Sequence, residues 1–295
     1  MENKFQGVGV ALATPFEKDG SIDFIGLEHL LDYTSKGGVD YWVLCGTTGE
    51  SATLSNDEKI DILEFAKENN PGNIPIVFGM GGNNTSQILK NIAATDFSGV
   101  DAILSVSPYY NKPSQSGLVK HYQTIADNCP VPIILYNVPG RTASNLLWET
   151  TVTLSKHTNI VGVKEASGNL EQCMRIYNST DDGFCLISGD DLLTLPILSL
   201  GGVGVISVLA NAFPIHFKNI VSNFKSGKID VARETIFELL DLNTLMYKES
   251  NPVGIKEVLR QLDICKNHVR LPLVTASESL INEINLIMGS LNMRM

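Results

Sequence analysis

Short runs rich in β-branched residues recur eight times in the first three quarters of this chain, and most are followed by a segment with helical periodicity. This alternation predicts a parallel sheet, because parallel neighbours need a long crossover that is usually a helix. Eight units over about 220 residues favour a closed (β/α)₈ TIM barrel over an open doubly wound sheet. The expected strands are Gly7–Ala13, Tyr41–Cys45, Ile74–Phe78, Ala102–Val106, Pro132–Asn137, Ile160–Lys164, Phe184–Ser188 and Val203–Ser207.

The alternation stops after Phe224, where the sequence predicts helices without strands between them. These helices are Ile229–Met246, Gly254–Leu262 and Ser277–Met288, the last opened by the capping box Thr275-x-x-Glu278. Within the barrel, a second capping box, Ser55-x-x-Glu58, is expected to open the helix Asp57–Glu68. We therefore expect a barrel domain over residues 1–225 and a helical C-terminal domain over residues 226–295.

Composition narrows the class of partner. The chain has 22 basic and 32 acidic residues, a formal charge of −10 and no basic run, which argues against nucleic acid and against an anionic membrane surface. The five cysteines form no CxxC pair, and no apolar signal segment opens the chain, so we expect a cytoplasmic protein. The uncharged stretch Leu192–Ile215 is broken by prolines and glycines into a short helix, a strand and a turn.

Chemistry in a barrel of this kind lies at the carboxyl ends of the strands. Here the second strand ends in GTTGE (46–50), the fourth in SPYYN (107–111), the fifth in YNVPGRT (136–142) and the sixth in Lys164. Loss of hydration at the end of an apolar strand favours the neutral amine of Lys164, which attacks carbonyl groups. Lys164 is therefore a candidate Schiff-base nucleophile. The alternative is a lysine that reaches solvent or pairs with Glu165.

The other strand ends offer hydroxyls, a guanidinium and backbone amides. The GTTGE loop suits a phosphate or a carboxylate, although an ordinary strand-to-helix turn has the same composition. The phenols of Tyr109, Tyr110 and Tyr136 are candidates for proton transfer or for packing. Arg141 follows a Pro-Gly turn and is either a carboxylate-binding fork or a surface arginine.

Neither a metal nor a nucleotide cofactor is expected. The five histidines, at positions 29, 121, 157, 216 and 268, never pair at ligand spacing. The GTTGE loop lacks the Gly-Lys-Ser/Thr ending of a P-loop, and Gly202-Val203-Gly204 lacks the rest of a dinucleotide fingerprint.

Five motifs taken together resemble one family. They are GTTGES at 46–51, SPYYNKPSQ at 107–115, YNVPGRT at 136–142, GVKEASG at 162–168 and NPVGIK at 251–256. From Gly7 to about Leu271 the chain resembles the 4-hydroxy-tetrahydrodipicolinate (dihydrodipicolinate) synthase family, a branch of the pyruvate-dependent class I aldolase superfamily. The resemblance implies a cytoplasmic lyase of lysine and diaminopimelate biosynthesis. It also implies a homotetramer, a dimer of dimers, that needs no cofactor beyond a covalent imine.

The resemblance also implies a role for individual residues. Lys164 would form the imine with pyruvate, and Tyr136 would pass protons in a relay with Thr47 and with Tyr110, which would reach into the site of a neighbouring subunit. Arg141 would hold the carboxylate of the second substrate, L-aspartate 4-semialdehyde. The carboxylate of pyruvate would be bound by Thr48 and the Ile206 backbone, and Gly189 would belong to the same substrate-binding set.

Two alternatives remain open. A sibling aldolase acting on a sugar acid, like N-acetylneuraminate lyase, is the nearer one, and Arg141 argues against it. A catalytically inactive barrel that binds a metabolite or a partner is the other.

The resemblance also concerns feedback by lysine. Of the family's positions that bind lysine as an inhibitor, this chain retains Ser51, Ala52, Asn83 and Tyr109. Two histidines and a glutamate are replaced by Asn56, Lys59 and Gln87. Inhibition by lysine is therefore expected to be weak or absent.

Overall fold

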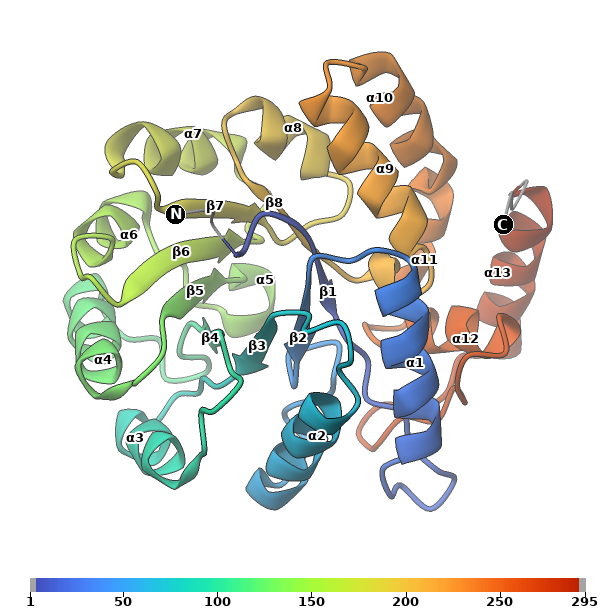
Figure 1. Ribbon diagram of the computed structural model, residues 1–295, viewed down its shortest axis with the longest axis horizontal. Coiled ribbons are helices and arrows are strands. Elements are labelled where there is room, and N and C mark those ends of the chain that lie inside the picture. The colour runs from blue at the N-terminus through green and yellow to red at the C-terminus, as the bar shows by residue number, and fades with distance from the viewer. Residues whose placement is uncertain (1–3, 292–295) are drawn as a thin grey trace. The chain divides into compact units, whose positions relative to one another are not determined.

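The computed structural model describes residues 4–291 and contains the predicted architecture (Figure 1). Eight strands form a closed barrel in sequential order, which confirms the (β/α)₈ fold. The ends of the strands differ from those expected by at most two residues. The strands are β1 (Gly7–Ala11), β2 (Tyr41–Leu44), β3 (Ile76–Gly79), β4 (Ala102–Val106), β5 (Ile133–Asn137), β6 (Ile160–Glu165), β7 (Cys185–Ser188) and β8 (Gly204–Ser207).

The chain divides into two compact units. The first comprises the described residues up to Gly9, Asp40–Val43 and Pro75–Ser207. In it the strands from β3 to β8 pair in parallel with their neighbours, and most of their side chains are buried, so they read as nearly continuous apolar runs. The helices of this unit are α3 (Thr85–Ala94), α4 (Gln115–Asn128), α5 (Pro139–Thr142), α6 (Trp148–Leu154), α7 (Leu170–Ser179) and α8 (Thr194–Ser199).

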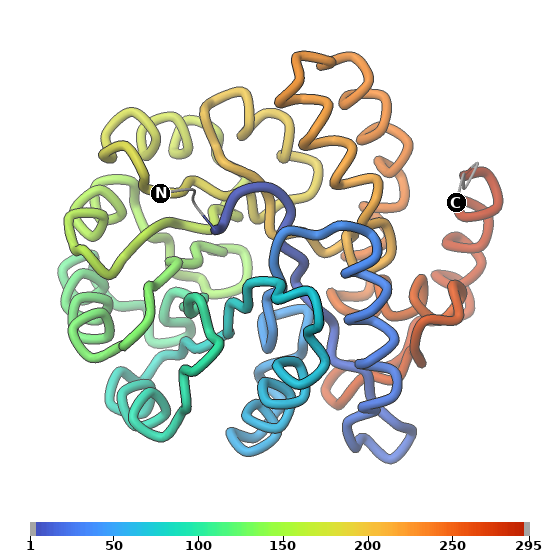
Figure 2. The backbone as a smooth tube through the Cα atoms, viewed as in Figure 1, coloured from blue at the N-terminus to red at the C-terminus, as the bar shows by residue number. Residues whose placement is uncertain are grey.

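The second unit comprises Val10–Val39, Leu44–Ile74 and the chain from Val208 onward. Helices α9 and α10 run side by side in it, as Figure 2 shows. Its α-helices are α1 (Phe24–Lys36), α2 (Asn56–Glu68), α9 (Pro214–Lys225), α10 (Ile229–Glu238), α11 (Leu240–Lys248), α12 (Val253–Gln261) and α13 (Glu278–Ser290), with a 3₁₀ turn, η1, at Leu209–Asn211. The predicted boundary at 225/226 lies in the turn between α9 and α10 and stays a prediction.

Helix signals in the sequence were right at one end of the chain and wrong at the other. Ser55 and Glu58 form the expected capping box of α2. Helix α13, in contrast, is capped by Ser277 rather than Thr275. The Ser277 hydroxyl accepts a hydrogen bond from the Leu280 amide, and Glu249 accepts two bonds from Ser277. A partner 28 residues away therefore selects the cap, which local spacing does not show.

The segment Ile229–Met246, predicted as one helix, is two helices that meet at Leu239. The Leu239 amide bonds to the Ile236 carbonyl three residues back, so the last turn of α10 tightens there. Leu239, Leu242 and Met246 are all buried as a result. No proline or glycine marks the break, so the apolar periodicity alone predicted a continuous helix.

The uncharged stretch Leu192–Ile215 is broken as expected into α8, β8 and a turn. Across residues 4–291, the structure contains no helix with both the length and the apolar character that crossing a bilayer requires.

Candidate active site

Lys164 lies near the end of β6 in the first unit, and its side chain is buried. The residue is only 4% exposed. Its Nζ lies 4.5 Å from the centroid of the Tyr136 ring, since Lys164 and Tyr136 are opposite each other in the register of β6 and β5. The alternative in which this lysine reaches solvent is therefore wrong.

The neighbouring carboxylate, Glu165, is bonded elsewhere. It accepts hydrogen bonds from Asn137 Nδ2 at 3.0 and 3.2 Å, from Gln172 Nε2 at 2.7 Å and from the Ser167 amide at 2.8 Å. Among residues 4–291, no ion pair joins Glu165 to Lys164. Glu165 therefore fixes the ends of β5 and β6 against α7, while the Lys164 amine keeps no compensating carboxylate in the described structure.

Gly189 packs closely against the lysine. A Cβ atom at this position would lie 3.1 Å from Lys164 Cε and 2.6 Å from the Ala166 Cβ. The Gly189 amide donates to the Glu165 carbonyl at 2.8 Å, which holds the turn after β7 against β6. Ile206, predicted to offer its backbone, is fully buried on β8. Of the residues predicted from sequence, the structure thus brings Lys164, Tyr136 and Gly189 together.

Arg141 is exposed, in the short helix α5 that begins with Pro139. Proline at the first helical position favours this turn, and Ala143 ends it with a left-handed backbone at φ 55°. No hydrogen bond or ion pair of the Arg141 guanidinium occurs within the described part of the chain. The guanidinium is therefore available to an anion from solution, as a carboxylate-binding fork requires.

The loop with Tyr109 and Tyr110 is fixed by hydrogen bonds from two asparagines. Asn83 Nδ2 donates to the Tyr109 carbonyl at 3.1 Å, and Asn111 Nδ2 donates to the Asn83 carbonyl at 2.9 Å. Tyr110 has φ 73°, a conformation that costs a non-glycine residue on the order of 1–3 kcal/mol, and it is 88% exposed. An aromatic ring held outward at such a cost is typical of a contact with another molecule.

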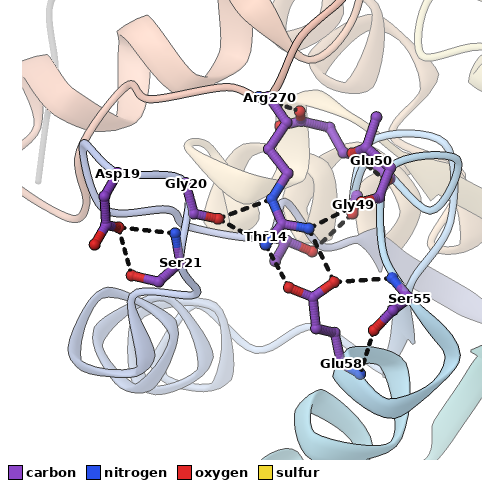
Figure 3. Close-up of polar contacts among 10 residues, drawn as sticks. Thr14, Asp19, Gly20, Ser21, Gly49, Glu50, Ser55, Glu58 and Arg270 are labelled. Atoms are coloured by element: carbon purple, nitrogen blue, oxygen red, sulfur yellow. Dashed lines mark hydrogen bonds and ion pairs between the residues drawn. The ribbon is translucent and has the colours of Figure 1, made fainter.

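The GTTGE loop lies in the second unit and is described within it. Thr48 is buried, whereas Thr47 is half-buried and its carbonyl accepts from the Glu50 amide at 3.1 Å. The Thr14 hydroxyl donates to the Gly49 carbonyl at 2.8 Å (Figure 3). Glu50 has φ 53°, and its carboxylate turns away from Thr47 into the protein interior. The loop connects β2 to α2, and its binding of an anion stays a prediction.

Sequence reasoning missed the residues that hold this loop. Lys256, fully buried on α12, pairs with Glu50 through a 2.5 Å contact and also donates to the His268 carbonyl at 2.7 Å. Asn251 Nδ2 donates to the Thr48 hydroxyl at 3.0 Å. Both residues belong to NPVGIK, so the motif was visible, but only the folded chain shows its partners.

A second anchor of the loop is Arg270 (Figure 3). Its backbone amide donates to Glu50 at 2.9 Å, and its guanidinium donates to both carboxylate oxygens of Glu58 and to the carbonyls of Gly20 and Thr53. These bonds to Glu58 are the main reason why the pKa of that carboxyl falls to about 2. No motif pointed to Arg270.

The positions that resemble a lysine-binding site are divided between the two units. In the first unit, Gln87 Nε2 donates to Asn91 at 2.9 Å, on the helix that follows Asn83. In the second unit, the Ser51 amide donates to the Gly46 carbonyl at 3.2 Å, Ala52 and Asn56 are exposed, and burial lowers the pKa of Lys59. Residues 4–291 contain no cluster of three or more histidine, cysteine or acidic side chains that could hold a metal ion.

Comparison with known proteins gives one consistent result. A model of the Dihydrodipicolinate synthetase family matches residues 4–290. The chain is 48% identical over 280 residues to the 4-hydroxy-tetrahydrodipicolinate synthase of Cytophaga hutchinsonii, covering 95% of this chain and 94% of that protein. The solved dihydrodipicolinate synthase of Thermotoga maritima has a TM-score of 0.94 at 36% identity, covering 97% of this chain and 98% of that chain. DHDPS from Cyanidioschyzon merolae, solved with lysine bound, has a TM-score of 0.94 at 37% identity, covering 98% of this chain and 99% of that chain.

Proposed function

Because this chain belongs to the dihydrodipicolinate synthetase family, we propose that it is a 4-hydroxy-tetrahydrodipicolinate synthase. This lyase joins pyruvate to L-aspartate 4-semialdehyde in the first committed step toward diaminopimelate and lysine. The observation that carries the proposal is Lys164, buried at the end of β6 without a carboxylate partner among the described residues. The sugar-acid alternative is not favoured, since the curated relatives at 43–48% identity carry the synthase name.

The chemistry starts at the amine of Lys164. The amine attacks the ketone of pyruvate and loses water to form an imine, whose cationic nitrogen makes the methyl group acidic. Loss of a methyl proton gives an enamine, and its carbon attacks the aldehyde of aspartate semialdehyde. The amine of this second substrate then displaces Lys164, and a six-membered ring closes. No cofactor is needed, because the cationic imine accepts the electron pair that remains when the methyl carbon loses its proton.

The remaining site residues have distinct roles in the proposal. Tyr136, whose ring lies against the Lys164 amine, passes protons to and from the imine, with Thr47 and Tyr110 as the other members of the relay. Arg141 binds the carboxylate of aspartate semialdehyde. Pyruvate's carboxylate is bound by Thr48 and the Ile206 backbone, and Gly189, which packs closely against Lys164, belongs to the same substrate-binding set.

Reductive trapping tests the assignment of Lys164. Pyruvate with borohydride should add one reduced pyruvyl unit to the intact protein, and peptide mapping should place it on Lys164. The Lys164→Ala variant should take up none, whereas Lys225→Ala, at the exposed end of α9, should be labelled like the wild type. Labelling on the buried Lys256, or equal labelling of Lys164→Ala, would disprove the assignment.

We further propose that the enzyme is a homotetramer, a dimer of dimers, in which Tyr110 completes the site of a neighbouring subunit. The support is the strained backbone of Tyr110 and its exposure in the single chain. Mixing the two weak variants Lys164→Ala and Tyr110→Ala tests this, because a mixed dimer contains one site with both residues intact. Random mixing should restore about a quarter of wild-type activity. No restoration by mixed dimers, or full activity of a monomer in sedimentation, would contradict it.

The cytoplasm is the compartment that we propose. All five cysteines are free and four of them are buried, which suits a reducing environment. Fractionation of the source cells with an activity assay tests this.

A further inference from the structure

Asn251 is the residue of the NPVGIK motif that contacts Thr48 of the GTTGE loop. It precedes α12, is buried, and donates from Nδ2 to the Thr48 hydroxyl at 3.0 Å. Its amide oxygen has no hydrogen-bond partner among residues 4–291. The reverse orientation of the amide would leave an NH₂ group with two unpaired donors in that place, which is less favourable than one unpaired acceptor.

The direction of this bond has a consequence for Thr48. A threonine hydroxyl has one hydrogen to donate and two lone pairs to accept with. Because Asn251 occupies a lone pair, the single hydrogen of Thr48 stays available for another acceptor. A carboxylate is an acceptor only, so a hydroxyl with its hydrogen free is the form that binds one.

The Asn251 bond is not needed to hold the loop in place. The Thr14 hydroxyl anchors Gly49, and the Arg270 amide fixes Glu50 (Figure 3). Lys256 also pairs with Glu50. Removal of the Asn251 amide therefore leaves the loop with its other anchors. What it removes is the control over which way the Thr48 hydroxyl points.

We propose that Asn251 is a positioning residue that commits the Thr48 hydroxyl to donate its hydrogen to the carboxylate of the keto acid. This rests on the proposed function, in which Thr48 binds pyruvate. Asn251 does not touch the substrate in this account and acts only through Thr48. Its effect should therefore disappear when the Thr48 hydroxyl is absent.

A double-mutant cycle tests the proposal, with the pyruvate concentration that half-saturates borohydride trapping as the readout. Asn251→Leu and Thr48→Val should each raise it by about tenfold to a hundredfold, the value of one hydrogen bond to a charged group. The double variant should match Thr48→Val alone. The proposal would be overturned if the double variant needed more pyruvate than Thr48→Val by the full effect of Asn251→Leu. It would also be overturned if Asn251→Leu needed the same pyruvate concentration as the wild type.

A matched control and a second variant separate this role from folding. Asn243→Leu makes the same change at a buried asparagine of α11, whose amide oxygen also has no partner in the described chain, and it should leave pyruvate trapping within about twofold of wild type. Asn251→Asp keeps the shape but accepts the Thr48 hydrogen when ionised. Relative to wild type, its defect should shrink as the pH falls, since the protonated carboxyl donates again. A defect that is independent of pH would contradict the proposal.

A failure of the proposed role of Asn251 can be told apart from a failure of the proposed function. If the wild-type protein traps no pyruvate, the function fails and the cycle has no baseline. If the wild type traps pyruvate and the cycle is additive, only the role of Asn251 fails.

Discussion

Two lysines are buried within residues 4–291, and they differ in what surrounds their charge. Lys256 is fully buried, and its amine contacts the Glu50 carboxylate, the His268 carbonyl and, at 4.2 Å, the ring of Phe16. Burial lowers the pKa of Lys256, and the Glu50 carboxylate opposes this effect. Lys164 is almost as buried, but in the described structure its amine has only the face of the Tyr136 ring beside it.

The difference shows that burial alone does not assign a role to a lysine. A buried amine that pairs with a carboxylate is a structural cation, and its lone pair is engaged by a proton. In the proposed function, Lys164, which makes no ion pair within residues 4–291, supplies the amine that forms the imine. Glu165 is the next residue of β6 and points to the opposite face of the strand, where its oxygens are bonded to Asn137, Gln172 and Ser167.

The largest expected effect is on stability. Lys256→Met should lower the free energy of unfolding by about 3–5 kcal/mol, because it leaves the buried Glu50 charge without its partner. The same substitution at Lys164 separates no ion pair in the described chain and should change stability by about 1 kcal/mol or less. Urea unfolding at a fixed protein concentration measures both. Equal losses in the two variants would remove the distinction drawn between these lysines.

Two arginines extend the comparison to substrate binding. Arg141→Ala should lower kcat/KM for aspartate semialdehyde by an amount equivalent to about 2–4 kcal/mol of transition-state stabilisation, since it removes a charge-assisted pair with the second substrate only. Pyruvate trapping and stability should stay close to wild type. Arg270→Ala is the opposite case, because this guanidinium is bonded within the protein, and it should lose stability instead. If Arg141→Ala loses pyruvate trapping as severely as turnover, Arg141 is structural.

A smaller effect is expected in the acid stability of the Arg270 contact. The pKa of Glu58 is depressed from about 4.5 to about 2, chiefly by the Arg270 bonds, so its contribution is present above pH 4.5 and is lost as the pH falls toward 2. The Glu58 side chain is 29% exposed, and solvent screening leaves about 1–2 kcal/mol. Glu58→Gln should flatten the stability profile between pH 5 and pH 2. Glu64→Gln, on the same helix and paired with Lys67, should change it much less.

The smallest effect should be inhibition by lysine. Gln87 offers no full negative charge to an incoming ammonium, and Lys59 adds a like charge, each costing binding about 1–2 kcal/mol. We therefore expect little inhibition in a steady-state assay until lysine reaches tens of millimolar. Restoring a carboxylate with Gln87→Glu should strengthen inhibition, and half-inhibition of the wild type below about one millimolar would show that the site survives these changes.

The sequence predicted the barrel and the buried Lys164 because both are local patterns. Strand and helix periodicities repeat within each strand–helix pair of the barrel, and a lysine inside an apolar run is visible as a charge in a predicted buried strand. The partners of NPVGIK could not be predicted in the same way, since Asn251 and Thr48 are 203 positions apart. The break at Leu239 was missed because it depends on packing and carries no glycine or proline.

Thr14 precedes the GTTGE loop in the chain, but Asn251, Lys256 and Arg270, its other anchors, are synthesised long after the loop itself. Glu50 is 206 positions before Lys256 and 220 before Arg270. At about 5–20 residues per second, a ribosome needs on the order of 10–40 s to translate from the loop to Asn251, the first anchor that follows it. A chain released by a premature stop codon between β8 and Asn251 would contain every strand, but the loop would keep only its Thr14 anchor, and Glu50 would lack both Lys256 and Arg270. The last quarter of the chain therefore decides whether a newly made molecule is competent, although the proposed catalytic residues are all translated before it.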